Sequence, residues 1–175
     1  MRFKQVILIV IGFSILSFGL PKNLQKKVHK EITGTFEIEN FDLISVTIPT
    51  ELEQTLPSRF GADNLFRIES NKKLIAYAYV SQAPSKTAQF DYLVLLDKDL
   101  VVIKTKILIY REEYGGEIGS TRWLKQFIGK TQLDDLKYGE NIIAISGATI
   151  SVRSFTEAMN NLLKSLKTLH SKNIL

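Results

Sequence analysis

Residues 65–110 read LFRIESNKKLIAYAYVSQAPSKTAQFDYLVLLDKDLVVIKTKILIY, and this stretch decides the fold. β-Branched and aromatic residues gather there in four runs, at residues 65–69, 74–80, 92–96 and 101–110. Residues 71–73 and 97–99 are typical of tight turns, whereas residues 81–89, which include Pro84, predict a longer loop. Four strands joined in this way predict an antiparallel meander.

Before this sheet the sequence predicts three short elements. Residues 23–31 are polar and compatible with a helix, which residues 33–35 are expected to end. Residues 41–48 are rich in β-forming side chains and predict a strand or extended segment. A short helix is then expected to begin at Pro49 and to end before Pro57.

After the sheet, Ser120 can cap a helix that runs to Gly129 and turns Trp123 toward the core. Residues 141–145 predict a short apolar strand. The last helix is expected at residues 148–171, with apolar residues at helical spacing: Phe155, Met159, Leu162, Leu163, Leu166 and Leu169. We therefore expect an α+β fold, a twisted antiparallel sheet with packed helices, preceded by an N-terminal hydrophobic segment.

Composition narrows the functional classes. The chain has 175 residues, of which 45% are hydrophobic and 23% charged, as in an ordinary globular domain. It has no cysteine, which excludes disulfides, thiolate metal sites and thiol catalysis. The two histidines, His29 and His170, lie near opposite ends, which argues against a histidine metal site or triad. We expect neither a metal site nor catalytic side chains of its own.

The N-terminus predicts export or membrane anchoring. Arg2 and Lys4 precede residues 6–20, which carry no charge, and Ser17 and Gly19 are small residues suited to a cleavage site. Residues 1–20 are therefore interpreted as a signal peptide or a membrane anchor, and both alternatives stay open. The rest of the chain has 21 basic and 18 acidic residues, a net charge of +3 that predicts no nucleic-acid binding.

One short segment suggests chemistry. Residues 145–151 read ISGATIS, in which small residues lead from the expected strand into the last helix. Such a helix start aims backbone N–H groups and a partial positive charge at an anion, typically a phosphate. Ser146, Thr149 and Ser151 add hydroxyl groups, and Arg153 could supply a cation. An ordinary serine cap at the start of a surface helix would give a similar pattern.

Ser146–Gly147–Ala148–Thr149 resembles the S/T-G-A-T motif of FMN-binding domains. These domains include the flavin subunits of sodium-pumping NADH:quinone oxidoreductases and of Rnf electron-transport complexes. In that family a flavin transferase uses FAD to join FMN to the final threonine of the motif by a phosphoester. The resemblance therefore implies covalent FMN on Thr149, with contacts from its neighbours Ser146, Gly147, Ala148, Ile150 and Ser151.

The resemblance extends over roughly residues 60–169. Residues 110–117 are similar to the family's Glu- and Gly-containing loop, which implies that Glu113, Tyr114 and Gly116 line the flavin pocket. Only Glu113 and Gly116 match the loop of the complex subunits, so the chain resembles a small stand-alone relative. Ile143 also stands where family members often carry an aspartate. We accordingly divide the chain into residues 1–20, an N-terminal helical and extended region at 21–59, and an FMN-binding domain at 60–171.

The resemblance implies an electron-transfer flavoprotein at the outer face of the cytoplasmic membrane or in the periplasm. Since the sequence shows no general acid, base or metal ligand set, an electron carrier fits better than a stand-alone enzyme. The expected partners are a flavin transferase for maturation, a membrane redox complex or another electron carrier, and the membrane itself through the N-terminus. Two alternatives remain: a non-redox module that binds flavin or another phosphorylated ligand, and an FMN-dependent reductase of an exported acceptor.

Overall fold

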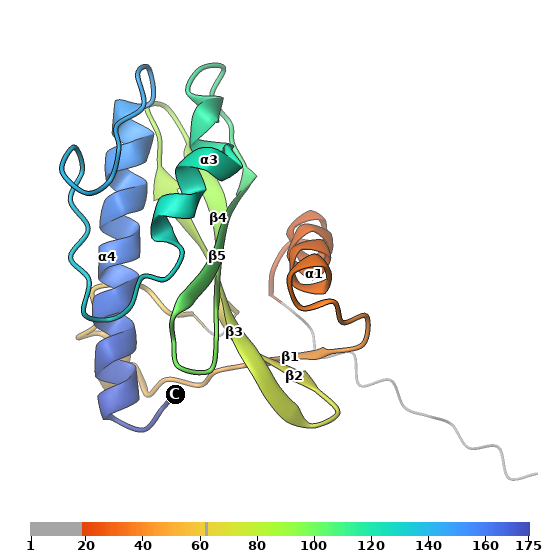
Figure 1. Cartoon of the computed structure of the whole chain (residues 1–175). Coiled ribbons are helices and arrows are strands. Elements are labelled where there is room, and N and C mark those ends of the chain that lie inside the picture. Colours follow the sequence, from red (N-terminus) through yellow and green to blue (C-terminus); the bar gives the residue numbers. More distant parts are fainter. Residues whose placement is uncertain (1–18, 62) are drawn as a thin grey trace, which may run out of the picture.

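In the computed structural model, which describes residues 19–61 and 63–175, a five-stranded antiparallel sheet lies between helices (Figure 1). Its strands follow chain order: β1 Asp42–Ser45, β2 Leu65–Ser70, β3 Lys73–Pro84, β4 Gln89–Leu96 and β5 Val102–Ile109. Both Asn71 and Lys72 have positive φ, which is the geometry of a two-residue hairpin whose twist matches the strands. The predicted meander and α+β class are therefore confirmed.

The predicted loop at residues 81–89 is shorter than expected. β3 and β4 stay paired as far as Pro84, which lies opposite Gln89, so that only residues 85–88 form the turn. Pro84 is the last residue of its strand, where the missing N–H costs little. Pro84 therefore marks the end of β3, whereas the sequence had placed it inside a loop.

Helix α4 (Thr149–Ser171) covers one face of the sheet, and the predicted apolar stripe is buried there (Figure 1). Phe155 lies at the centre of an aromatic cluster, with its ring centroid 4.9 Å from Phe127 and 5.1 Å from Tyr92. Trp123 packs beside Phe155 and is 5% exposed, which confirms its expected place in the core.

Helix α1 (Lys22–Phe36) covers the opposite face with Leu24, Val28 and Ile32. The sequence predicted an end near residues 33–35, and this prediction is wrong. The helix continues because its last residue, Phe36, packs against the core on this face, and the Thr35 hydroxyl donates to the carbonyl of Glu31. Tertiary packing thus outweighs the weak helix propensity of glycine and threonine.

Most of the hydrophobic N-terminal segment, residues 1–18, lies outside the described residues, so the predicted signal peptide or anchor stays a prediction. Within the part of the chain that is described, none of the helices combines the length and apolar character needed to cross a bilayer. The predicted short helix after Pro49 is confirmed as α2 (Thr50–Glu53).

Two predictions after the sheet need correction. The single helix predicted at residues 120–129 is instead a short helix, α3 (Thr121–Leu124), followed by a 3₁₀ turn, η2 (Lys125–Phe127). The predicted cap is confirmed, since the Ser120 side chain accepts a bond from the N–H of Trp123. Residues 141–145 do not form a strand. Both backbone groups of Ile143 bond to side chains, Gln126 and Trp123, and so are not available to a neighbouring strand.

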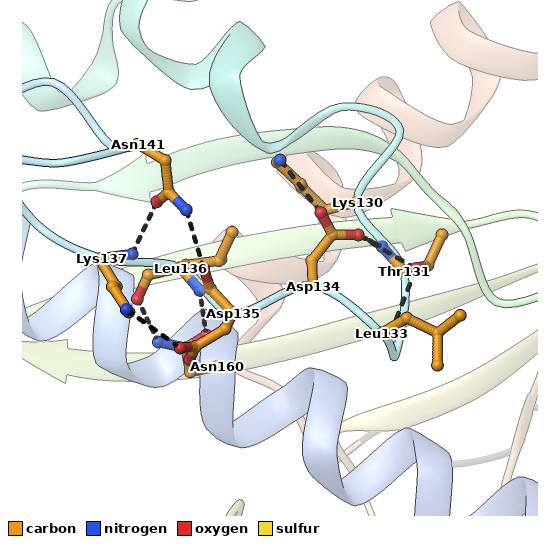
Figure 2. A network of polar contacts seen from close by, with 9 residues as sticks. All are labelled: Lys130, Thr131, Leu133, Asp134, Asp135, Leu136, Lys137, Asn141 and Asn160. Atoms are coloured by element: carbon orange, nitrogen blue, oxygen red, sulfur yellow. Dashed lines mark hydrogen bonds and ion pairs between the residues drawn. The ribbon is translucent and has the colours of Figure 1, made fainter.

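A connector of residues 130–141 runs from η2 back to α4 (Figure 2). Asn160, on α4, accepts a bond from the N–H of Leu136 and donates one to its carbonyl, at 2.8 and 2.6 Å. Asn141 bonds in the same way to the N–H of Lys137 and the carbonyl of Asp135, at 2.7 and 2.8 Å. The connector is therefore tied to α4 immediately before the chain turns toward the start of that helix.

Candidate functional site

The start of α4 is an uncapped helix N-terminus. Its N-cap residue is Ala148, which has no side-chain oxygen to cap the helix, and its first turn carries no acidic residue. The first bond of the helix runs from the N–H of Val152 to the carbonyl of Ala148, at 2.9 Å. The N–H groups of residues 149–151 precede that bond, so an anion at this point would satisfy them.

Two glycines bring a second backbone segment against this helix start. Gly147 has φ +77° and Gly115 has φ +82°, values that L side chains rarely adopt. A Cβ on Gly115 would lie 2.9 Å from the Tyr110 hydroxyl and 3.0 Å from the Cβ of Ala148. The loop after β5 therefore packs directly on the residues that begin α4.

A cavity of about 360 Å³ lies over this contact, within the size range of small-molecule sites. Residues from three parts of the chain line it: Lys86, Tyr110, Glu112, Tyr114, Gly147, Ala148, Thr149, Ile150 and Ser151. Tyr114 and Ile150 are 79% and 50% exposed, so both offer apolar surface at the cavity. The cavity thus combines a helix start without a side-chain cap, which suits a phosphate, with exposed apolar side chains that a planar ring could cover.

Six of the predicted site residues meet at this cavity: Tyr114, Gly147, Ala148, Thr149, Ile150 and Ser151. The other three do not line it. Ser146 lines a neighbouring cavity of about 490 Å³ beside Trp123. Glu113 and Gly116 are exposed, and a Cβ on Gly116 would meet no described atom within 4 Å.

Sequence reasoning missed Lys86, Tyr110 and Glu112. Tyr110 follows β5, and its hydroxyl lies 3.0 Å from the Oγ of the buried Ser151, so it joins the sheet to the helix start. Lys86 comes from the distant β3–β4 turn and adds a cation at the cavity. Arg153, the cation suggested by the sequence, instead lies over the Tyr138 ring, 4.8 Å from its centroid.

Glu112 anchors the β3–β4 turn. Its carboxylate accepts bonds from the hydroxyl of Ser85 (2.6 Å), the N–H and hydroxyl of Thr87 (2.7 and 2.8 Å) and the N–H of Ala88 (3.1 Å). These bonds, led by that from Ser85, lower the pKa of Glu112 from 4.5 to about 2. Glu112 thereby places the turn that carries Lys86 at the edge of the cavity.

We expect Glu112→Gln to lower the thermal midpoint of unfolding at pH 7, since an amide cannot accept all four bonds. Because the folded pKa lies below the unfolded one, the ionised carboxylate stabilises the fold fully above pH 4.5. That contribution is lost as the pH falls from about 4.5 to about 2. Thermal unfolding of the wild type and of Glu112→Gln across this pH range should show the difference between their midpoints becoming smaller as the pH falls. The exposed neighbour offers a control, Glu113→Gln, and an equally large effect there would contradict the assignment.

The described residues contain no group of three or more His, Asp or Glu side chains placed to hold a metal ion. The groups at the cavity are backbone amides, one lysine, one carboxylate and several hydroxyls, including the exposed hydroxyl of Thr149. Because the Glu112 carboxylate is engaged by the β3–β4 turn, the backbone amides and Lys86 are the groups that suit an anion.

Comparisons with known proteins bear on this geometry. Residues 86–164 match the FMN-binding domain family, and that span contains all nine residues that line the cavity. Among solved structures the chain is similar to NqrC from Shewanella oneidensis, with 19% sequence identity and a TM-score of 0.50. The alignment covers 73% of this chain and 68% of that one, a likeness of fold. No curated protein matches the chain.

Proposed function

We propose that this protein is an electron-transfer flavoprotein whose FMN is esterified to Thr149, a proposal supported by the match of residues 86–164 to the FMN-binding domain family. The position of Thr149 carries the proposal. It is the first residue of α4, its side chain is exposed, and it lines the same cavity as Ile150 and Ser151, which follow it in the first turn. A phosphoester on its Oγ would place a negative charge at the positive end of a 23-residue helix.

The residues at the cavity fit the parts of FMN. The N–H groups of residues 149–151 suit the phosphate, and Lys86 adds a positive charge beside them. Tyr114 and Ile150 offer exposed apolar surface to the flavin ring, which would shield it from water. When bound, the flavin accepts and passes on one or two electrons. The role of this chain is to hold the phosphate and to set the exposure of the ring.

Attachment requires one group transfer from FAD. The Thr149 oxygen forms a bond to the phosphorus of the FMN half, the pyrophosphate bond breaks, and AMP leaves with its phosphate. The hydroxyl proton of Thr149 passes to a base of the flavin transferase, and no oxidant or reductant is consumed. The exposure of Thr149 supports this proposal, because the transferase must reach the hydroxyl.

We place the protein at the outer face of the cytoplasmic membrane, with a membrane redox complex or another electron carrier as its partner. The support is the sequence of residues 1–20, in which Arg2 and Lys4 precede an uncharged apolar stretch. The family match supports a redox partner, since a bound flavin without its own substrate must exchange electrons with other molecules.

Intact-mass measurement of the full chain, expressed with and without a flavin transferase, tests the proposal. With the transferase we expect a yellow protein whose mass gain equals FMN less one water, and without it an unmodified chain. A yellow but unmodified protein would support FMN binding and would overturn the proposed ester on Thr149. A colourless, unmodified protein from cells that modify a known substrate of the transferase would overturn both.

A further inference from the structure

Ile143 is held by both of its backbone polar groups. Its N–H donates to Gln126 Oε1 at 2.6 Å, and its carbonyl accepts from Trp123 Nε1 at 2.8 Å. The other end of the Gln126 amide donates to the carbonyl of Trp123, also at 2.8 Å. The Gln126 amide therefore bridges Trp123 of α3 and the segment that leads to Thr149, with each end of the amide assigned to one partner.

Few side chains of the segment between Ile142 and Ala148 are buried. Ile142 and Ala148 are buried, but residues 143, 144, 146 and 147 between them are exposed and belong to no helix or strand. The Ile143 side chain is 69% exposed, so it contributes little apolar burial. Its backbone bonds to Gln126 and Trp123, together with the packing of the partly buried Ile145 against the core, therefore restrain the path from Ile142 to the start of α4.

The residues that hold Ile143 are themselves packed in the core or next to it. Trp123 is buried, and its ring packs against Phe127 at 5.2 Å and Phe155 at 5.8 Å between centroids. Gln126 follows on the same turn and is half-buried. Before the segment, Asn160 ties the connector to α4, as Figure 2 shows. The approach to Thr149 is therefore held both at Leu136 and at Ile143, and Gln126 acts at Ile143, the point nearer to Thr149 along the chain.

We propose that Gln126 is a positioning residue for the attachment of FMN to Thr149, an inference that rests on the function proposed above. Gln126 does not line the cavity of Thr149 and lies instead along the neighbouring one, with Ser146. It acts through Ile143: by fixing that backbone it restricts Ser146 and Gly147, and hence the direction in which the Thr149 hydroxyl faces the incoming phosphate. Without this bond only a fraction of the molecules would present the hydroxyl correctly.

The test is a time course of FMN attachment to the purified full chain by a flavin transferase and FAD, followed by intact mass. Gln126→Met preserves side-chain length but removes both bonds, and we expect an initial rate roughly fivefold lower, as for loss of one or two hydrogen bonds. Gln126→Glu retains an acceptor for the Ile143 N–H and should fall between that variant and the wild type. The exposed Gln54, changed to Met, is the matched control and should react at the wild-type rate.

Hydrogen exchange of the flavin-free chain separates positioning from general stability. In Gln126→Met we expect the Ile143 amide to exchange roughly tenfold faster, while amides of β4 keep their wild-type protection. An unchanged attachment rate in Gln126→Met overturns the proposal, as does an unchanged exchange rate at Ile143. If the wild type itself takes up no flavin, the proposed function fails, and the exchange result alone decides whether Gln126 orders the segment.

Discussion

Thr149→Ala should abolish covalent flavin, with the modified fraction falling from nearly complete to below detection by intact mass. The substitution removes the only oxygen at this position that can form the phosphoester, while alanine suits the first turn of a helix. We expect the fold to survive, so that the unfolding midpoint stays close to that of the unmodified wild type.

Neighbouring hydroxyl groups provide matched controls for this result. Thr149→Ser keeps an oxygen and should accept flavin, more slowly because the smaller side chain samples more rotamers. Ser146→Ala should remain fully modified, since Ser146 lines the adjacent cavity. A flavin-sized mass gain in Thr149→Ala, or its loss in Ser146→Ala, would show that the ester lies elsewhere.

Phe155→Ala should cost about 3–5 kcal/mol in the free energy of unfolding, as is typical when a buried aromatic ring is deleted. Phe155 is fully buried, and its ring meets those of Phe127 and Tyr92 edge to face. Because it lies on the α4 face that packs on the sheet, the variant should also loosen the helix that begins at Thr149. Urea denaturation, analysed as a two-state transition, measures the change.

Two further variants serve as controls for the size of this effect. Phe155→Leu retains most of the volume and should cost less than about 1.5 kcal/mol. Leu133→Ala, at a side chain that is 86% exposed, should change stability by no more than about 0.5 kcal/mol. If Phe155→Ala cost no more than Leu133→Ala, the aromatic cluster would not be the centre of the core.

Much of this fold follows from local patterns. The alternation in residues 65–110 and the helical spacing from Phe155 to Leu169 predict the sheet and the helix that covers it, because burial of one face imposes these periods on any sequence. The cap at Ser120 was predictable because its bond joins residues only three apart in the sequence. The S-G-A-T motif likewise indicated a phosphate site at a helix start.

The local errors share one cause. Residues 141–145 have the composition of a strand, but Gln126 and Trp123 take the backbone bonds that a strand would need. Likewise α1 continues past Gly34 because its last residue, Phe36, packs against the core on this face of the sheet. In each case the deciding contact comes from outside the segment, and no pattern within it reports that contact.

By itself the sequence determined an antiparallel sheet covered by a long amphipathic helix, and a threonine at the start of that helix as the candidate flavin site. Only the tertiary structure decided what surrounds the threonine. It places Lys86 and Glu112 at the cavity, leaves Glu113 outside it, and brings Gly115 against Ala148. The physical reason is that periodicity and caps depend on neighbours along the chain, whereas a cavity depends on how distant segments meet when the sheet and helices pack.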